Sequence, residues 1–294
     1  MDEKALKYAW FHYPFKLGFA KASYRTKGGF LKRRTILAAL LVGIALIGIG
    51  LTTGPVMSAE DIDPDADRIL RSMSDYLSGL SAFSATVDID NEIIDLSGQK
   101  LQLSATSSLI VERPGKFFER RQDRLVDRDF IFDGKVLTLY SKRINAYYQI
   151  ETPGETIDDA IQAMHVKLGL DVPGADLFSA DPYFILSDGV VSGHYLGTAI
   201  VGGIKCHYLA FRKDEVDLQL WVQTGDTPLP MKYIITTKWM TGAPQYSLRF
   251  RDWNTKPEIE AALFEFTIPE GAWKLQTLHI NEFGELVLKV EGDQ

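Results

Sequence analysis

The chain has 294 residues and a formal net charge of −7, and 46% of its residues are apolar, a composition that supports a globular core. Charge is uneven: residues 1–35 hold nine Lys or Arg and two acidic residues, a net +7, which leaves −14 on the rest. An acidic body argues against nucleic acid as a partner, and the single cysteine, Cys206, excludes an intramolecular disulfide or a metal site built from several cysteines.

The N-terminal region has the features of a membrane-targeting segment. Residues 36–51 are wholly apolar, follow Lys32-Arg33-Arg34, and can be extended to residue 57, long enough to span a bilayer. We expect residues 1–35 to be a basic cytoplasmic segment and residues 36–57 an inner-membrane anchor, with the body in the periplasm. A cleaved signal peptide and a soluble periplasmic body are the alternative, by the Sec or the twin-arginine route.

Residues 58–64 form an expected linker into the first helix. Asp63 can cap that helix, Pro64 suits its first turn, and apolar residues recur at three-and-four spacing from Ile69 to Leu80. From Phe83 the period changes to two, which predicts antiparallel strands. We expect a sheet domain over residues 65–274 and a C-terminal extension over 275–294.

A charged strand pair is expected over residues 117–133, joined to the next strand by the Asp133-Gly134 turn. Cross-strand ion pairs on a solvated face are one interpretation. A docking surface for an anionic partner is the other. The arginines concerned are Arg120, Arg121, Arg124 and Arg128.

The middle of the chain predicts a helix over 156–168 and a covering segment of short helical turns over 172–187. A hairpin follows over 193–213, turning at Gly202-Gly203. This register places His207 opposite Thr198 and His194 opposite Phe211, so the two histidines lie too far apart to share a metal. We expect no metal site and no cofactor.

The clearest hairpin is Asp217 to Lys238, whose strands flank the turn Thr224–Pro228. Further strands are expected at 246–250 and at 264–268. Helices and antiparallel strands in this order predict an α+β fold with a curved sheet.

Several segments resemble one bacterial family, known only as predicted periplasmic proteins of unknown function. They are SDYLSGLSAFSATVD, VERPGKF, FDGKVLTLY, DPYFILSDGV, GIKCHYLAFR, VDLQLWV, PLPMKYIITTK, YSLRFRDWN and FEFTIPEGA, all between residues 64 and 274. That family is similar to the lipoprotein-carrier superfamily of LolA, LolB and RseB. The resemblance implies an open half-barrel with helices on its concave side, and hydrophobic-ligand binding.

The resulting expectation is a non-catalytic protein that binds a lipid or a lipoprotein acyl chain. No nucleophile–base pair or catalytic motif is recognisable in the sequence. An envelope scaffold or signalling module that acts on a protein partner through its surface is the alternative. Aromatic residues of the central strands are the predicted ligand contacts: Tyr140, Tyr148, Trp221, Tyr233, Trp239 and Phe250.

Overall fold

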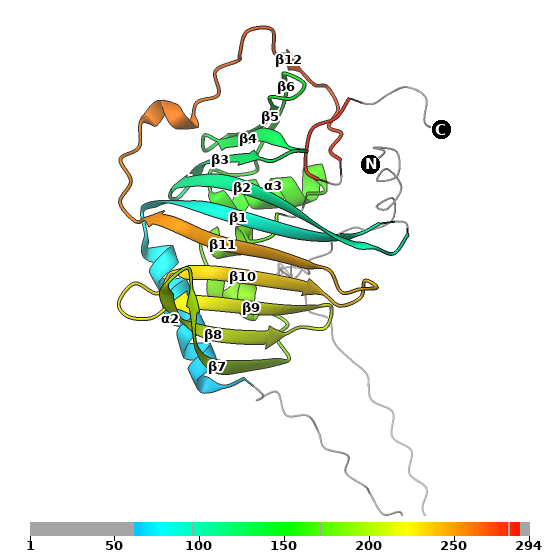
Figure 1. Cartoon of the computed structure of the whole chain (residues 1–294). Coiled ribbons are helices and arrows are strands. Elements are labelled where there is room, and N and C mark those ends of the chain that lie inside the picture. Colours follow the sequence, from blue (N-terminus) through cyan, green and yellow to red (C-terminus); the bar gives the residue numbers. More distant parts are fainter. Residues whose placement is uncertain (1–61, 96, 171, 282, 289–294) are drawn as a thin grey trace, which may run out of the picture.

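The computed structural model describes residues 62–288, except 96, 171 and 282. In this part of the chain twelve strands form one sheet, in the order β12-β6-β5-β4-β3-β2-β1-β11-β10-β9-β8-β7 (Figure 1). All neighbours are antiparallel except β12 and β6, which are parallel. The strands are β1 Ala82–Ile94, β2 Lys100–Glu112, β3 Lys116–Gln122, β4 Asp127–Phe132, β5 Val136–Ser141, β6 Ala146–Glu151, β7 Ser192–Val201, β8 Ile204–Arg212, β9 Val216–Gln223, β10 Pro230–Thr237, β11 Gln245–Asn254 and β12 Trp273–Lys274.

The sheet consists of two meanders that meet at its centre. Strands β1 to β6 form one and strands β7 to β11 the other, and they join where β1 pairs with β11. In that pair Val87 lies opposite Phe250. The centre of the sheet is therefore built from segments more than 150 residues apart in the chain.

The helices are α2 Pro64–Gly79, α3 Ile157–Leu168 and α4 Pro182–Ser187, with 3₁₀ turns η1 Ala175–Phe178 and η2 Ala261–Phe264. Asp63 caps α2 by accepting the Asp65 N–H at 2.8 Å, as the sequence predicted. Thr156 and Asp159 form a reciprocal capping box at the start of α3. Gly169 ends α3 in the left-handed conformation, with φ of 64°.

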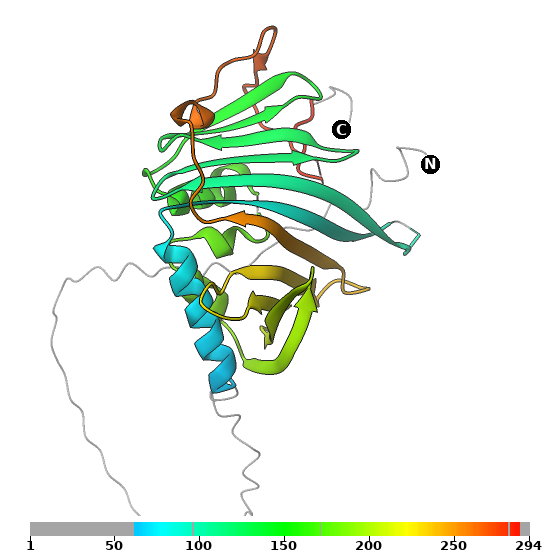
Figure 2. The same cartoon turned by 60° about the vertical axis from the view of Figure 1, so that its left-hand side comes forward.

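Helices α2 and α3 lie on the same face of the sheet, and the sheet curves around them (Figure 2). The buried stripe of α2 packs against strands β7 to β11, where Leu70 and Met73 join the same core as Leu220. Helix α3 packs against the other half through Ala160 and Met164. An open, curved antiparallel sheet with helices on the concave side was the expected architecture, and it is confirmed.

Two details of the expected strands are wrong. His194 pairs with Ala210, not Phe211, because β7 bulges between Tyr195 and Thr198 and shifts the register beyond that point. His207 does lie opposite Thr198, on the near side of the bulge.

The predicted strand at 264–268 is also not formed. Phe264 is buried at the end of η2, whereas Ile268 is 57% exposed. This segment crosses the outer face of the sheet, and Phe266 packs its ring 5.0 Å from that of Tyr147. The alternating apolar residues of 264–268 therefore pack against the surface of the sheet and do not form one of its strands.

The expected C-terminal extension packs onto the domain as far as the structure describes it. Leu275 and Leu286 are buried in the same core as α3. Glu285 is only 2% exposed, and its side chain accepts the backbone N–H groups of Asp127 and Leu286. Residues 275–288 therefore help to close one side of the sheet.

The expected cytoplasmic segment 1–35 and the apolar segment 36–57 lie outside the described residues, as does most of the linker. Among the described helices, none has the length and hydrophobicity needed to cross a membrane.

Candidate ligand-binding site

A hollow of about 830 Å³, open mouth included, lies between the concave face of the sheet and the α3–η1 region. Inward-pointing and outward-pointing positions alternate along each strand, and the inward positions of successive strands carry mostly apolar residues. The sheet wall of the hollow is therefore mostly apolar. Ile161 and Met164 of α3 and Phe178 of η1 form the opposite wall. The sheet wall includes Val87, Ile89, Leu109, Phe117, Leu248 and Phe250.

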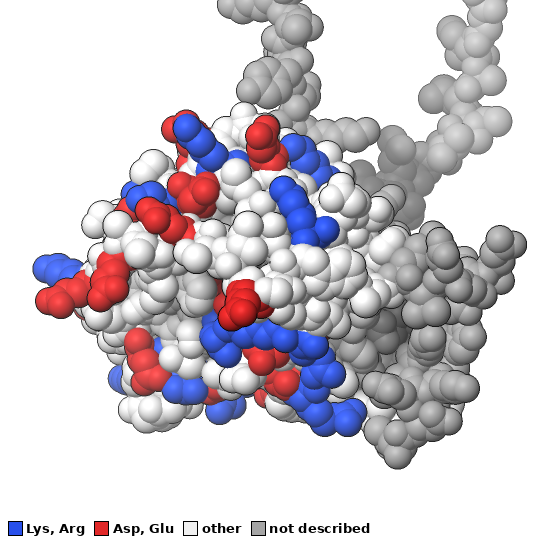
Figure 3. Space-filling view, turned by 90° about the horizontal axis from the view of Figure 1, so that it is seen from above, with Lys and Arg blue, Asp and Glu red and all other residues white. Residues whose placement is uncertain are grey.

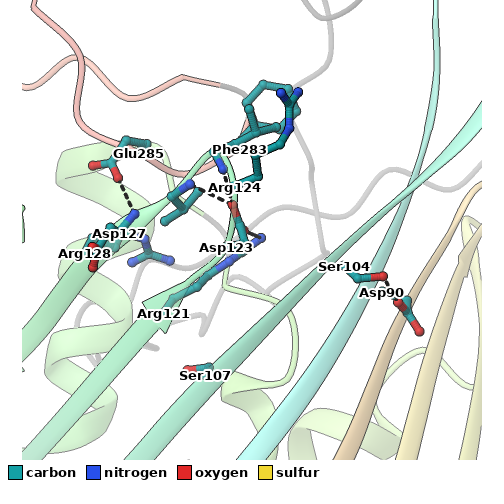
Figure 4. Close-up of polar contacts among 12 residues, drawn as sticks. Asp90, Ser104, Ser107, Arg121, Asp123, Arg124, Asp127, Arg128, Phe283 and Glu285 are labelled. Carbon is teal, nitrogen blue, oxygen red and sulfur yellow. Dashed lines mark hydrogen bonds and ion pairs between the residues drawn. The ribbon is translucent and has the colours of Figure 1, made fainter. Parts of the chain in front are cut away.

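One part of this hollow is polar. Glu119 and Arg121 of β3 point inward with Phe117, and Arg128 of β4 points inward with Phe130. Arg121 and Arg128 are directly opposite across the ladder, and Figure 4 shows them on adjacent strands. Like charges in directly opposed positions destabilise a sheet. Ser107 and Tyr246 complete the polar lining.

Arg128 is a buried cation with incomplete hydrogen bonding. The residue is 6% exposed, and among the described residues its Nε and Nη1 atoms have no hydrogen-bond partner. The Oε2 atom of Glu119 lies 3.7 Å from Nη1, beyond hydrogen-bond distance. Burial lowers the pKa of Arg128, against the attraction of Glu119. Burial also raises the pKa of Tyr246, although both guanidinium groups act in the opposite direction.

The carboxylates around the arginines divide their oxygens between the arginines and other donors. Ser107 donates to Oε1 of Glu119 at 2.5 Å. Asp123 accepts the backbone N–H groups of Leu125 and Val126, and its other oxygen is 3.4 Å from Arg121 (Figure 4). The two arginines consequently retain unused donors that face the hollow.

A second space of about 1150 Å³ adjoins the first, because Ile161 and Met164 border both. Its polar group is Asp176, whose Oδ2 accepts the Tyr233 hydroxyl at 2.9 Å, while its buried Oδ1 has no partner among the described residues. Burial raises the pKa of Asp176, and the Tyr233 hydrogen bond and Lys213 reduce that rise. Burial lowers the pKa of Lys213.

The six predicted ligand contacts do not lie together. Phe250 lines the first space and Tyr233 the second. Tyr148 packs at the margin of the α3 core, outside both linings. The other three lie away from the hollow: Tyr140 packs on Phe266, Trp221 stacks on Tyr208, and Trp239 is 44% exposed in the turn after β10.

The four arginines proposed as one partner surface are divided between two faces. Arg121 and Arg128 point into the hollow, whereas Arg120 points outward and lies 3.5 Å from Asp127. Arg124 is exposed in the turn between β3 and β4. On the face seen in Figure 3, basic and acidic side chains are interspersed, without a large patch of one sign.

The polar lining was missed because the charged strand pair was assigned to a solvated face. The period of two already held the signal: Phe117, Glu119 and Arg121 share one face of β3, and Arg128 shares a face of β4 with Phe130. The aromatic residues at alternate positions identify the inward face of each strand. Charged residues an even number of positions away from them point inward as well.

Comparison with known proteins assigns the family. The family model described as "Predicted periplasmic protein (DUF2092)" matches residues 66–278. The chain belongs to this family. No curated protein matches this DUF2092 chain. Among the described residues, no group of three His, Cys, Asp or Glu side chains is placed to hold a metal ion.

Solved structures similar to this DUF2092 protein include an uncharacterised conserved protein from Thermus thermophilus, with 12% identity and a TM-score of 0.44, covering 72% of this chain and 98% of that one. LprF from Mycobacterium bovis matches at 16% identity and a TM-score of 0.41, covering 71% and 97%. A LolA superfamily protein from Nitrosomonas europaea matches at 9% identity and a TM-score of 0.37, covering 67% and 96%.

Proposed function

We propose that this periplasmic family member acts by binding and not by catalysis, and that its half-barrel holds the hydrophobic part of a lipid or of a lipoprotein acyl chain. One observation carries the proposal: the concave face borders an open hollow of about 830 Å³, mouth included, whose lining is mostly aliphatic and aromatic. Apolar side chains normally pack against one another, so an apolar lining left facing a hollow is suited to an apolar occupant.

The energetics favour an alkyl chain. Each methylene transferred from water into such a lining contributes about 0.8 kcal/mol, so a long chain gains several kcal/mol before any polar contact is made. The adjoining space beyond Ile161 and Met164 has a mixed lining, in which Val172, Ala175 and Leu218 continue the apolar surface beside charged residues. A single extended chain can therefore run along the sheet beneath α3.

Native mass spectrometry of the full chain, extracted from the envelope in mild detergent, tests the proposal directly. We expect an additional mass that dissociates as a lipid or acyl species. A bare polypeptide mass, together with no binding of a fluorescent acyl probe, would refute it and favour the alternative of an envelope interaction module.

A matched pair of variants separates binding in the hollow from adsorption to the surface. Ala175→Trp places an indole where Ala175 borders both spaces, and we expect acyl-probe binding to be lost. Ile200→Trp adds the same side chain at a strand position that is 67% exposed, and binding should be retained. Equal binding by both variants would place the ligand elsewhere.

A further inference from the structure

We propose that Arg121 and Arg128 form an anion-binding subsite that holds the charged headgroup, a carboxylate or a phosphate, of the amphiphile whose chain fills the hollow. This inference rests on the proposed function and specifies its ligand class. It predicts that the protein discriminates between ligands of equal chain length by headgroup charge.

The first support is the state of Arg128. The side chain is nine-tenths buried, lines the hollow, and has two nitrogen atoms without hydrogen-bond partners in the described part of the chain. A buried polar group without a partner is costly, and for a cation more so. A guanidinium offers donors in a planar fork that matches a carboxylate or a phosphate.

The second support is that a second cation faces the first. Arg121 is the cross-strand partner of Arg128, and its Nε is also buried without a hydrogen bond among the described residues. An anion placed between the two would relieve their repulsion and use the free donors of both. Tyr246, which lines the same part of the hollow, supplies one more hydroxyl donor.

The local carboxylates fill this role only in part. Asp123 accepts a hydrogen bond from Arg121 Nη2 at 3.4 Å, whereas Nε of Arg121 and both Nε and Nη1 of Arg128 have no hydrogen-bond partner among the described residues. Glu119 is the closest to Arg128, but its Oε2 remains 3.7 Å from Nη1 and has no hydrogen bond among the described residues. Glu285 uses both oxygens on backbone N–H groups, of Asp127 and Leu286. A completed internal ion-pair network would show short contacts here, and the observed distances instead leave room for an external acceptor.

The charge at the other space sets the direction of the ligand. Asp176, Asp188, Asp214 and Glu215 line it, with Lys213 and His165 as the basic residues among them. An anionic headgroup is disfavoured there and favoured at the arginines. The apolar surface between the two then receives the chain, with its terminal methyl directed toward Tyr233.

Three ligands of one chain length test the inference on the full-length protein: dodecanoate, dodecyl phosphate and dodecanol, each used to displace a fluorescent acyl probe. We expect at least one of the anions to bind about tenfold or more tightly than dodecanol, from charge-assisted hydrogen bonds to the guanidinium groups. Preference for dodecanoate indicates a fatty-acid-like headgroup, and preference for dodecyl phosphate a phospholipid-like one.

The variants Arg128→Gln and Arg121→Gln should each reduce this preference, measured as the ratio of anion affinity to dodecanol affinity, by about threefold or more. Arg120→Gln is the matched control, because Arg120 lies on the same strand as Arg121 but on the outer face near Asp127. Its headgroup preference should equal that of the unmodified protein. The parallel dodecanol measurement reports whether each variant is still folded and competent to bind.

The outcomes separate the two proposals. Equal affinity of the unmodified protein for all three ligands would overturn the anion subsite and leave hydrophobic binding intact. Failure of all three ligands and the probe to bind would refute the proposed function itself. An equal loss of preference in Arg120→Gln and Arg128→Gln would show a general charge effect and would also overturn the subsite.

Discussion

Tyr233→Phe is expected to destabilise the protein by an amount that depends on pH. The substitution removes only the hydroxyl group, which donates to Asp176 Oδ2 at 2.9 Å. Tyr233 is 1% exposed, so water does not replace the lost donor. Its effect therefore reports on the charge of Asp176 in the folded protein.

The sign of this pH dependence follows from the pKa shift of Asp176. Burial raises the pKa of this carboxyl above its ordinary value of 3.8. A raised folded-state pKa means that the group contributes stability below its unfolded-state pKa, and that this stability is lost as pH rises through the folded-state value. The Tyr233 hydrogen bond opposes the rise, so its removal moves the pKa of Asp176 further upward and deepens the loss at neutral and alkaline pH.

The magnitude follows from the type of hydrogen bond. Because the pKa of Asp176 is raised, this carboxyl is more protonated at pH 4 than an ordinary one, and its ionised fraction grows toward pH 8. A hydrogen bond to a charged group contributes about 1.5–3 kcal/mol and one to a neutral group about 1 kcal/mol. We therefore expect Tyr233→Phe to lower the free energy of unfolding by about 1 kcal/mol where Asp176 is neutral, and by up to about 2 kcal/mol as it ionises, so that the cost is larger at pH 8 than at pH 4.

Urea denaturation followed by far-UV circular dichroism at the two pH values measures this difference. The other carboxyls titrate alike in both proteins and cancel. Tyr208→Phe is a matched control, since its hydroxyl donates to the neutral Gln219 side chain at 2.6 Å and its cost should not change with pH. A cost of Tyr233→Phe that is equal at both pH values, or larger at pH 4, would refute the argument.

Three further predictions concern the covering helix, the hollow and the cysteine. Thr156→Ala should destabilise by about 1 kcal/mol in urea because it removes the α3 cap. Thr241→Ala, at an exposed position outside the helices, is the comparison, and equal effects would contradict a capping role. Phe250→Ala should cost about 3–5 kcal/mol in the same assay because this wall residue is 1% exposed, and a cost below about 1 kcal/mol would show that the sheet closes over the gap. The Cys206 thiol is buried and its pKa is raised by burial, so a thiol reagent should label it only in urea, whereas rapid labelling of the native protein would contradict its position.

Local patterns predicted much of the framework. Asp63 and Pro64 start α2 as their chemistry requires, and the Gly202-Gly203 turn joins β7 to β8 with Val201 opposite Ile204. These features depend on residues a few positions apart, so the sequence carries them directly. Register beyond the bulge was not predictable in the same way, since a bulge shifts every later pair by its extra residue.

The candidate site was predicted less well. Aromatic identity selected Trp221 and Tyr140, yet both lie on the outer face, where Tyr208 and Phe266 cover them. Alternation within β3 and β4 was the better guide, because it follows the pleat and not the chemistry of the side chain. Phe250 and Tyr233 satisfy both criteria: Phe250 lines the hollow and Tyr233 the adjoining space.

The sequence by itself determined most of the helices and strands, their hairpin turns and the family of this protein, because each depends on periodicity, turn chemistry and local motifs. Only the tertiary structure decided which residues share the hollow. Pairing of β1 with β11 joins the two meanders, and pairing of β3 with β4 sets Arg121 against Arg128, both largely buried, on the concave face. Burial and cross-strand proximity are properties of the assembled sheet, and they convert a charged strand pair into a candidate anion site.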